Sequence, residues 1–213
     1  MKILTEITTA VFAWAAFAQA LVCMVVLCGC GGKPKIAALE PGAVVVAFGD
    51  SLTAGYGAEE EESYPAVLAK LTGLKVINEG VPGEISEAGS DRLPSVLRKH
   101  DPELVILCHG GNDMLQRVDD ALIAAHVQEM IEAVQATGAD VILLGVPKPG
   151  LFLKAPPFYA AAAHRYEIPY DGKVLPEILA TGSLKSDAIH PNAEGYQVLA
   201  KRVADLIRTG QKR

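Results

Sequence analysis

Short apolar runs alternate with amphipathic segments along the chain from residue 43 onward. The predicted strands cover residues 43–48, 75–80, 103–111, 139–147 and 167–171. Apolar side chains at every third or fourth position predict helices over residues 63–73, 86–100, 119–137, 157–166 and from 193 onward. Continuously apolar strands separated by such helices indicate a parallel sheet that is covered on both faces. We therefore predict one three-layer α/β/α domain with a five-stranded parallel sheet, and periodicity alone leaves the strand order open.

Polar and helix-breaking residues mark the limits of two predicted helices. Ser63 is the expected N-cap of the helix 63–73, and Gly73 is the expected stop. Pro94 removes a backbone donor from the helix 86–100, so we expect a bend or a restart there. The four glutamates at 59–62 are expected to form a solvated loop before Ser63, since negative charge is favourable near a helix N-terminus.

An uncharged stretch, residues 10–28, precedes this domain. It ends in Leu27-Cys28-Gly29-Cys30, which resembles the lipobox of bacterial lipoproteins and implies lipidation at Cys30. The alternatives are plain secretion or an uncleaved anchor, because a run of this length is close to the ~20 residues that span a bilayer. We expect a signal or membrane segment at 1–29, a linker at 30–42 and the folded domain at 43–213. Each alternative places the domain in the cell envelope or beyond it.

Charge and cysteine usage narrow the class of protein. The formal net charge is −6, and an acidic surface argues against a nucleic-acid partner. Three of the four cysteines lie in or just after the uncharged stretch, so Cys108 has no partner in the domain for an internal disulfide. Because Cys108 lies inside an apolar run, we expect a buried, inert thiol.

Polar turns follow three of the predicted strands, and a fourth precedes the last helix. They read GDS at 49–51, NEGVPGEIS at 78–86, GGND at 110–113 and SDAIHPN at 186–192. The carboxyl ends of parallel strands share one edge of a sheet, and this edge is where such folds bind ligands. Residues from position 50 to position 190 are therefore expected to meet in one crevice.

The residue types in these turns match the requirements of ester hydrolysis. A serine hydroxyl such as Ser51 needs an imidazole to take its proton, and that imidazole needs a carboxylate to orient it. His190 and Asp187 lie three positions apart, and Pro191 keeps the backbone at His190 extended. Candidate donors for the oxyanion are the backbone N–H groups of Ser51 and Gly83 and the amide of Asn112.

The blocks GDSLTAGYG, GVPGE, GGND and DAIHPN, in this order and spacing, resemble the signature blocks of the SGNH (GDSL) hydrolase superfamily. The resemblance covers about residues 44–207 and is strongest to the bacterial thioesterase/lysophospholipase and arylesterase branch. It implies a flavodoxin-like sheet, no metal and no cofactor. It also implies a triad of Ser51, Asp187 and His190, with Gly83 and Asn112 as oxyanion donors. Ser51 does not lie in a G-x-S-x-G elbow, which argues against the α/β-hydrolase fold.

Other residues of the polar turns have structural interpretations. Asp50 and Asp113 are expected to brace the site through backbone hydrogen bonds. His109 ends a buried strand and is expected to be a structural or pocket-wall histidine.

The substrate is expected to be a small-molecule or lipid ester. Some apolar residues after the third and fourth strands are candidates for the acyl or aryl wall of the pocket or a membrane-facing lip: Leu115, Leu151, Phe152, Leu153 and Phe158. Packing onto the domain's own core is the alternative for the last four. The leading function is a serine carboxylic-ester hydrolase. The alternatives are an O-deacetylase of envelope polysaccharide and a non-catalytic flavodoxin-like envelope lipoprotein.

Overall fold

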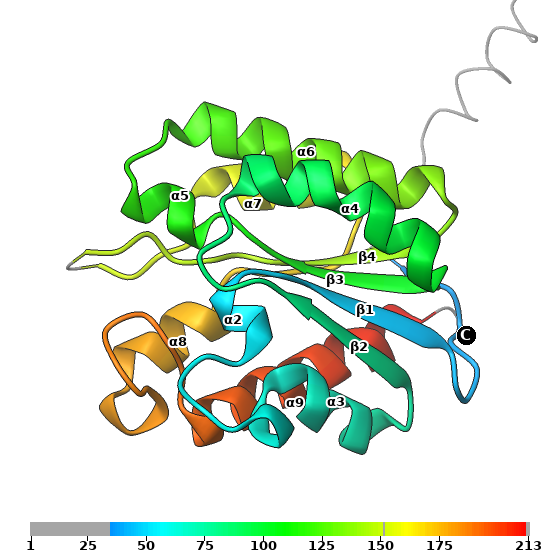
Figure 1. Cartoon of the computed structure of the whole chain (residues 1–213), viewed down its shortest axis with the longest axis horizontal. Helices are drawn as coiled ribbons and strands as arrows, with labels where there is room; N and C mark the ends of the chain where they lie inside the picture. The colour runs from blue at the N-terminus through cyan, green and yellow to red at the C-terminus, as the bar shows by residue number, and fades with distance from the viewer. Residues whose placement is uncertain (1–34, 151, 212–213) are drawn as a thin grey trace, which may run out of the picture. The chain divides into compact units, whose positions relative to one another are not determined.

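In the computed structural model, residues 35–150 and 152–211 are described. Within this part of the chain, the strands form one parallel sheet in the order β2-β1-β3-β4-β5 (Figure 1). The strands are β1 (Val44–Gly49), β2 (Lys75–Gly80), β3 (Leu104–Cys108), β4 (Asp140–Leu144) and β5 (Tyr170–Asp171). The order reverses between β1 and β3, as in flavodoxin-like folds, which places a crevice at the carboxyl ends of these two strands. The predicted five-stranded parallel sheet is confirmed.

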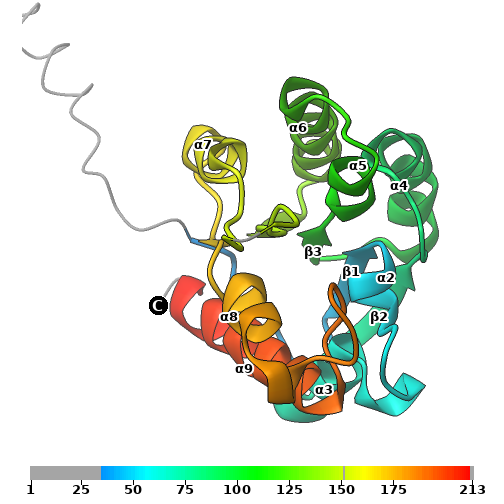
Figure 2. The same ribbon diagram turned by 90° about the vertical axis from the view of Figure 1, so that its left-hand side faces the viewer.

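Helices cover both faces of the sheet (Figures 1 and 2). One layer contains α4 (Ser86–His100), α6 (Asp120–Ala136) and α7 (Pro157–Arg165). The other contains α3 (Tyr64–Thr72), α8 (Val174–Ala180) and α9 (Ala193–Gly210). The short helices α2 (Ser51–Ala54) and α5 (Gly111–Leu115) follow β1 and β3 directly. The three-layer architecture predicted from the alternating pattern is therefore confirmed.

The core follows the apolar periodicity of the sequence. Every residue of β3 is buried, as a strand packed on both faces requires. The apolar face of α6 is fully buried through Ile123, Val127, Met130, Ile131 and Val134. Each such side chain contributes about 1.5–3 kcal/mol by leaving water. On α9 the buried face runs through Tyr196, Leu199, Val203 and Ile207, while Leu206 is only half-buried.

Some elements differ from the sequence-based expectation. The helix α4 is continuous through Pro94, which excludes the restart and leaves the bend as the expectation there. Ser63 occupies the N-cap position of α3, but its hydroxyl donates to the Glu60 carbonyl instead of capping the helix. Residues Glu60–Glu62 form a 3-10 turn with no buried residue, within the segment expected to be a solvated loop. The strand β5 is shorter than predicted, since Pro169 has no N–H with which to extend the ladder.

The N-terminal segment is described only from residue 35, so the lipobox and Cys30 lie outside the described residues. Ile36 is buried, and its N–H donates to the Gly210 carbonyl at 2.8 Å. Contacts with the domain therefore begin before residue 43, inside the expected linker. No helix in the described part of the chain has the length and apolar character to cross a bilayer.

Candidate active site

Ser51 lies at the point where β1 ends and α2 begins. Asp50 caps this helix, because its Oδ1 accepts a hydrogen bond from the Leu52 N–H at 3.0 Å. Gly49 is required by close packing, since a Cβ at this position would overlap the Cys108 carbonyl oxygen of β3. The serine is thus presented at the carboxyl edge of the sheet by a strand end that admits no larger residue.

Ser51, His190 and Asp187 form a continuous hydrogen-bonded series. The Oγ of Ser51 lies 3.0 Å from Nε2 of His190, and Nδ1 of His190 lies 2.7 Å from Oδ2 of Asp187. Oδ1 of Asp187 also accepts hydrogen bonds from the N–H groups of Ile189 and His190. Partial burial disfavours the carboxylate charge, but these hydrogen bonds outweigh it and lower the pKa of Asp187 below its usual value.

The charge on Asp187 determines how the imidazole is arranged. An ionised carboxylate can only accept hydrogen bonds, so Nδ1 of His190 carries the proton. Nε2 is then free to accept the hydroxyl proton of Ser51, which is the arrangement that a general base requires. The ring of Tyr56 lies against this imidazole, with 4.6 Å between the ring centroids. Sequence reasoning did not identify this contact, although Tyr56 lies in the same block as Ser51.

The candidate oxyanion donors come from three different segments. Nδ2 of Asn112 donates to the Glu84 carbonyl at 3.0 Å, and Asn112 lines the cavity beside Ser51. Among the described residues, the N–H groups of Ser51 and Gly83 have no hydrogen-bond acceptor. Gly83 lies in the exposed turn between β2 and α4 with φ +82°, outside the set of residues that line the cavity.

A cavity of about 280 Å³ opens beside Ser51 and His190. Its wall is mainly apolar and includes Leu52, Leu115, Val146, Pro147, Pro149, Leu153, Leu179 and Ile189. One cationic residue, Lys185, also lines it, and its Nζ donates to the Leu179 carbonyl. The cavity therefore suits an apolar group that lies beside the Ser51 hydroxyl.

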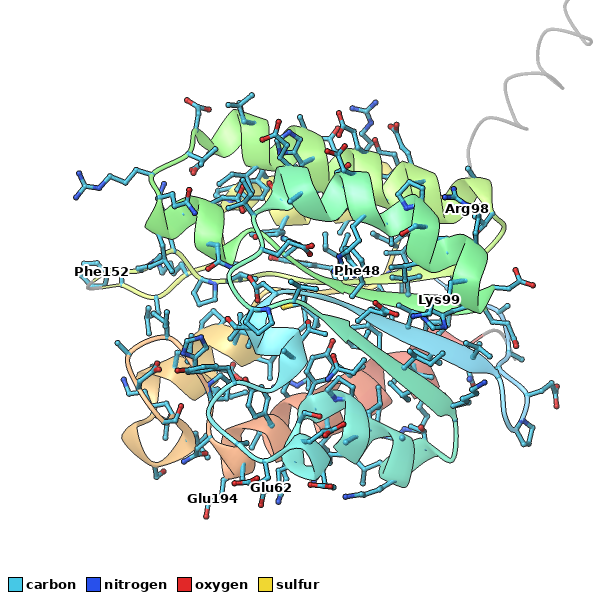
Figure 3. All side chains as sticks on the ribbon, in the orientation of Figure 1. Phe48, Glu62, Arg98, Lys99, Phe152 and Glu194 are labelled. Carbon is cyan, nitrogen blue, oxygen red and sulfur yellow. The ribbon has the colours of Figure 1, made fainter. Side chains whose placement is uncertain are left out.

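Of the predicted pocket residues, the structure places Leu115 and Leu153 in the cavity wall. Phe152 is 77% exposed and points away from the domain (Figure 3), whereas its neighbour Leu153 lines the cavity. Both residues lie in the loop closed by the bridge between Lys148 and Lys154, and within that loop the two neighbouring side chains face different sides. Phe158 does not reach the cavity either, since it belongs to α7 and packs against Tyr159 and the core. Leu151 lies outside the described residues.

The remaining polar residues brace the site. His109 is buried and does not line the cavity, which agrees with a structural role. Asp113 accepts hydrogen bonds from the N–H and the hydroxyl of Ser86, as expected for a bracing residue. Burial raises the pKa of Asp50, which lies beneath Ser51. Cys108 is buried, as predicted. Across residues 35–150 and 152–211, no group of three or more potential ligand side chains is arranged to hold a metal ion.

Comparison with known proteins agrees with this geometry. Residues 47–198 match the model of the GDSL-like lipase/acylhydrolase family. The chain is 27% identical over 169 residues to thioesterase 1/protease 1/lysophospholipase L1 of Escherichia coli, covering 76% of this chain and 81% of that protein. It is also 27% identical over 179 residues to an arylesterase of Vibrio mimicus, covering 79% of this chain and 90% of that protein.

A solved structure shows the same fold. The crystal structure of TesA superimposes with a TM-score of 0.71 at 26% identity, covering 78% of this chain and 98% of that one. The family match, the parallel sheet and the serine at the end of β1 lead to one conclusion. This chain belongs to the GDSL-like lipase/acylhydrolase family.

Proposed function

We propose that this protein hydrolyses carboxylic esters through an acyl-enzyme formed on Ser51. The observation that carries the proposal is the series of hydrogen bonds from Ser51 through His190 to Asp187, beside an apolar cavity. The names of the relatives in Escherichia coli and Vibrio mimicus support an esterase or thioesterase reaction.

In the acylation step, Oγ of Ser51 attacks the substrate carbonyl carbon while Nε2 of His190 takes the hydroxyl proton. The imidazolium that forms is stabilised by the carboxylate of Asp187, and it then protonates the departing alcohol or thiol. In the deacylation step, His190 takes a proton from a water molecule as this water attacks the acyl carbon. The bond between the acyl carbon and Oγ of Ser51 then breaks, His190 returns the proton to Oγ, and the carboxylic acid is released.

The negative charge that develops on the carbonyl oxygen needs donors that are already in place. We assign this role to the N–H of Ser51, Nδ2 of Asn112 and the N–H of Gly83. The free N–H groups of Ser51 and Gly83 support the assignment, as does the position of Asn112 in the cavity wall.

The size of the cavity bears on the substrate class. Ligand pockets measure about 300–1,000 Å³, so a cavity of about 280 Å³ fits a short acyl chain or one aromatic ring. We therefore assign small acyl or aryl esters and thioesters as substrates. A panel of acetyl-sugar, aryl, thioester and lysophospholipid substrates tests the assignment, and preference for acetyl-sugars would favour the O-deacetylase instead.

The nucleophile is tested by labelling with a fluorophosphonate, which reacts with an activated serine. Wild-type protein should be labelled on Ser51, and Ser51→Ala should lose both label and ester hydrolysis. Ser95→Ala is a matched control, because Ser95 is an exposed residue on α4 whose hydroxyl donates to the Arg92 carbonyl. An unlabelled, folded wild-type protein would favour the non-catalytic lipoprotein.

We also propose that the protein is exported and lipidated at Cys30, which anchors it to a membrane of the cell envelope. The support is the apolar stretch at 10–28 followed by Leu27-Cys28-Gly29-Cys30. Metabolic labelling with a fatty acid should mark the wild type and Cys28→Ser but not Cys30→Ser. Equal labelling of all three proteins would refute lipidation at Cys30.

A further inference from the structure

Two segments that carry candidate oxyanion donors are tied together by side-chain hydrogen bonds. Residues 83–86, the donor turn, contain Gly83, and residues 109–113, the facing turn, contain Asn112. The carbonyl of Glu84 accepts the hydrogen bond from Nδ2 of Asn112 at 3.0 Å. Beyond it, Asp113 accepts hydrogen bonds from the N–H of Ser86 at 2.8 Å and from its hydroxyl at 2.6 Å. These three hydrogen bonds join the two segments.

The side chain of Glu84 lies at the centre of this arrangement. Its Oε1 and Oε2 accept hydrogen bonds from Nε and Nη2 of Arg92, each at 2.7 Å, which is a bidentate pair. The guanidinium of Arg92, from α4, also lies over the ring of Phe48, from β1, 4.1 Å from its centroid. Burial disfavours the charge on Glu84, but the bonds from Arg92 and His109 lower its pKa to about 2. The carboxylate is thus charged although its side chain is only 7% exposed.

His109 links this carboxylate to the facing turn. Nδ1 of His109 accepts the Gly110 N–H at 3.1 Å, so Nε2 carries the ring proton and donates it to Oε2 of Glu84 at 3.1 Å. Gly89 leaves space for this ring, because a Cβ at position 89 would overlap Nε2 of His109. The imidazole therefore connects the two segments in a fixed orientation.

We propose that Glu84 is a positioning residue for the oxyanion donors: its carboxylate, bound by Arg92 and His109, holds the donor turn against the facing turn so that Gly83 and Asn112 stay at the distance the transition state needs. The proposal rests on the assignment of Gly83 and Asn112 as donors. Glu84 itself does not line the cavity and is not a catalytic residue. It acts on catalysis because electrostatic stabilisation of an oxyanion depends on donors that need no rearrangement during the reaction.

A role limited to stability predicts a different outcome from a role in donor placement. Glu84→Gln keeps one acceptor oxygen but places an amide NH₂ against a donor of Arg92 or His109, which lowers the stability of the fold. Misplaced donors additionally weaken transition-state binding, while binding of the uncharged ground-state ester is unaffected. The separation of kcat from KM therefore discriminates between the two roles.

The experiment compares Glu84→Gln with Glu79→Gln. Glu79 is the matched control, since it also contacts Arg92, at 3.3 Å, but it lies in β2 outside both segments. The concentration of active sites is measured by fluorophosphonate titration, so that unfolded protein does not lower the apparent kcat. We expect Glu84→Gln to lower kcat by about 10- to 100-fold with little change in KM, a part of the loss known for removal of an oxyanion donor. Glu79→Gln should retain kcat within about twofold.

A double-mutant cycle with Asn112→Ala makes the test specific. If Glu84 acts by placing the donors, Glu84→Gln should cost much less in kcat when Asn112 is already absent. The proposal would be overturned if Glu84→Gln lowered kcat by the same factor with and without Asn112. It would also be overturned if Glu84→Gln had the wild-type kcat and only a lower melting temperature. If Glu84→Gln does not fold, it is replaced in the double-mutant cycle by Glu84→Asp, which keeps the charge. A wild type that takes no label refutes the esterase assignment itself, whereas a labelled wild type with an unaffected Glu84→Gln refutes only this inference.

Discussion

The hydroxyl of Ser51 lies 3.0 Å from Nε2 of His190, although 139 positions separate the two residues along the chain. Ser51 reaches this point at the end of β1, whereas His190 comes from the loop that precedes α9. A serine hydroxyl is a weak nucleophile by itself, so the proposed reaction requires a base at this distance from Ser51. Predictions about the reaction therefore concern the groups that set this distance and the charge around it.

Replacement of Asp187 by Asn should lower kcat by about 100- to 10,000-fold while leaving the fold intact. Asn can donate to Nδ1 of His190, which favours the tautomer with the proton on Nε2, where it can no longer accept from Ser51. Steady-state kinetics with an aryl ester measure the loss. Since the side chain of Asp187 is 45% exposed, the melting temperature should hardly change. A variant with wild-type kcat would show that Asp187 does not orient the imidazole.

The rate should fall as the pH is lowered between about 8 and about 5, because only the neutral imidazole of His190 can take the serine proton. The pKa of Asp187 lies below its usual value, so this carboxylate stays ionised in that range and does not contribute to the acid limb. The measurement is kcat/KM against pH with a non-ionising ester. A flat profile would contradict the assignment of His190 as base.

Removal of the Asn112 amide should lower kcat by about 100- to 1,000-fold with a small effect on KM. Asn112→Ala removes a donor to the developing oxyanion, whereas the uncharged substrate gains little from the same amide. The comparison of kcat and KM for this variant with Gln116→Ala is informative, because Gln116 follows α5 outside the cavity. Equal losses in the two variants would mean that Asn112 only supports the local fold.

Acyl-chain preference should depend on Leu153 and not on Phe152. Leu153→Trp narrows the cavity, so kcat/KM for longer acyl chains should fall about tenfold or more relative to acetyl esters. Phe152→Ser is the matched control from the next position, where the ring is 77% exposed, and its chain-length profile should match the wild type. A changed profile in Phe152→Ser with no change in Leu153→Trp would place the acyl group outside this cavity.

The stabilising effect of Glu84 should depend on pH in a defined direction. Its pKa is lowered from an ordinary 4.5 to about 2, so the folded state favours the ionised form. The resulting stabilisation is complete above pH 4.5 and disappears as the pH falls toward 2. Denaturant unfolding of wild type and Glu84→Gln should therefore show a difference in unfolding free energy near neutral pH that shrinks below pH 4.5. A difference independent of pH would mean that the carboxylate charge is not what stabilises the fold.

Much of the fold and site was accessible from sequence because the signals are local. The apolar run of β3 and the apolar face of α6 each occupy one segment, and their burial follows directly from period and composition. Asp187 and His190 lie in one loop, so their contact was also predictable from spacing. The resemblance of the four blocks to one superfamily indicated that distant turns belong to a single site.

Other features depend on which surfaces meet. The carboxylate of Glu84 contacts Arg92 from α4 and His109 from the end of β3. The spacing of these three residues along the chain does not predict that they meet. Phe152 and Leu153 are neighbours in the sequence, and both are apolar. The path of the chain between Lys148 and Lys154 decides that Phe152 is exposed and that Leu153 lines the cavity. Likewise, Phe158 was indistinguishable from a pocket residue until α7 was seen to pack it onto the core.

The amino-acid sequence by itself determined the order of strands and helices, the buried faces of each, and the residues able to act on an ester. These properties follow from hydrophobic periodicity and from the chemistry of individual side chains, which act over a few residues. Only the tertiary structure decided the strand order, the shape of the cavity and the contacts of the Glu84 carboxylate. Such features arise when segments remote in the chain pack together, and the geometry of that packing has no local signature.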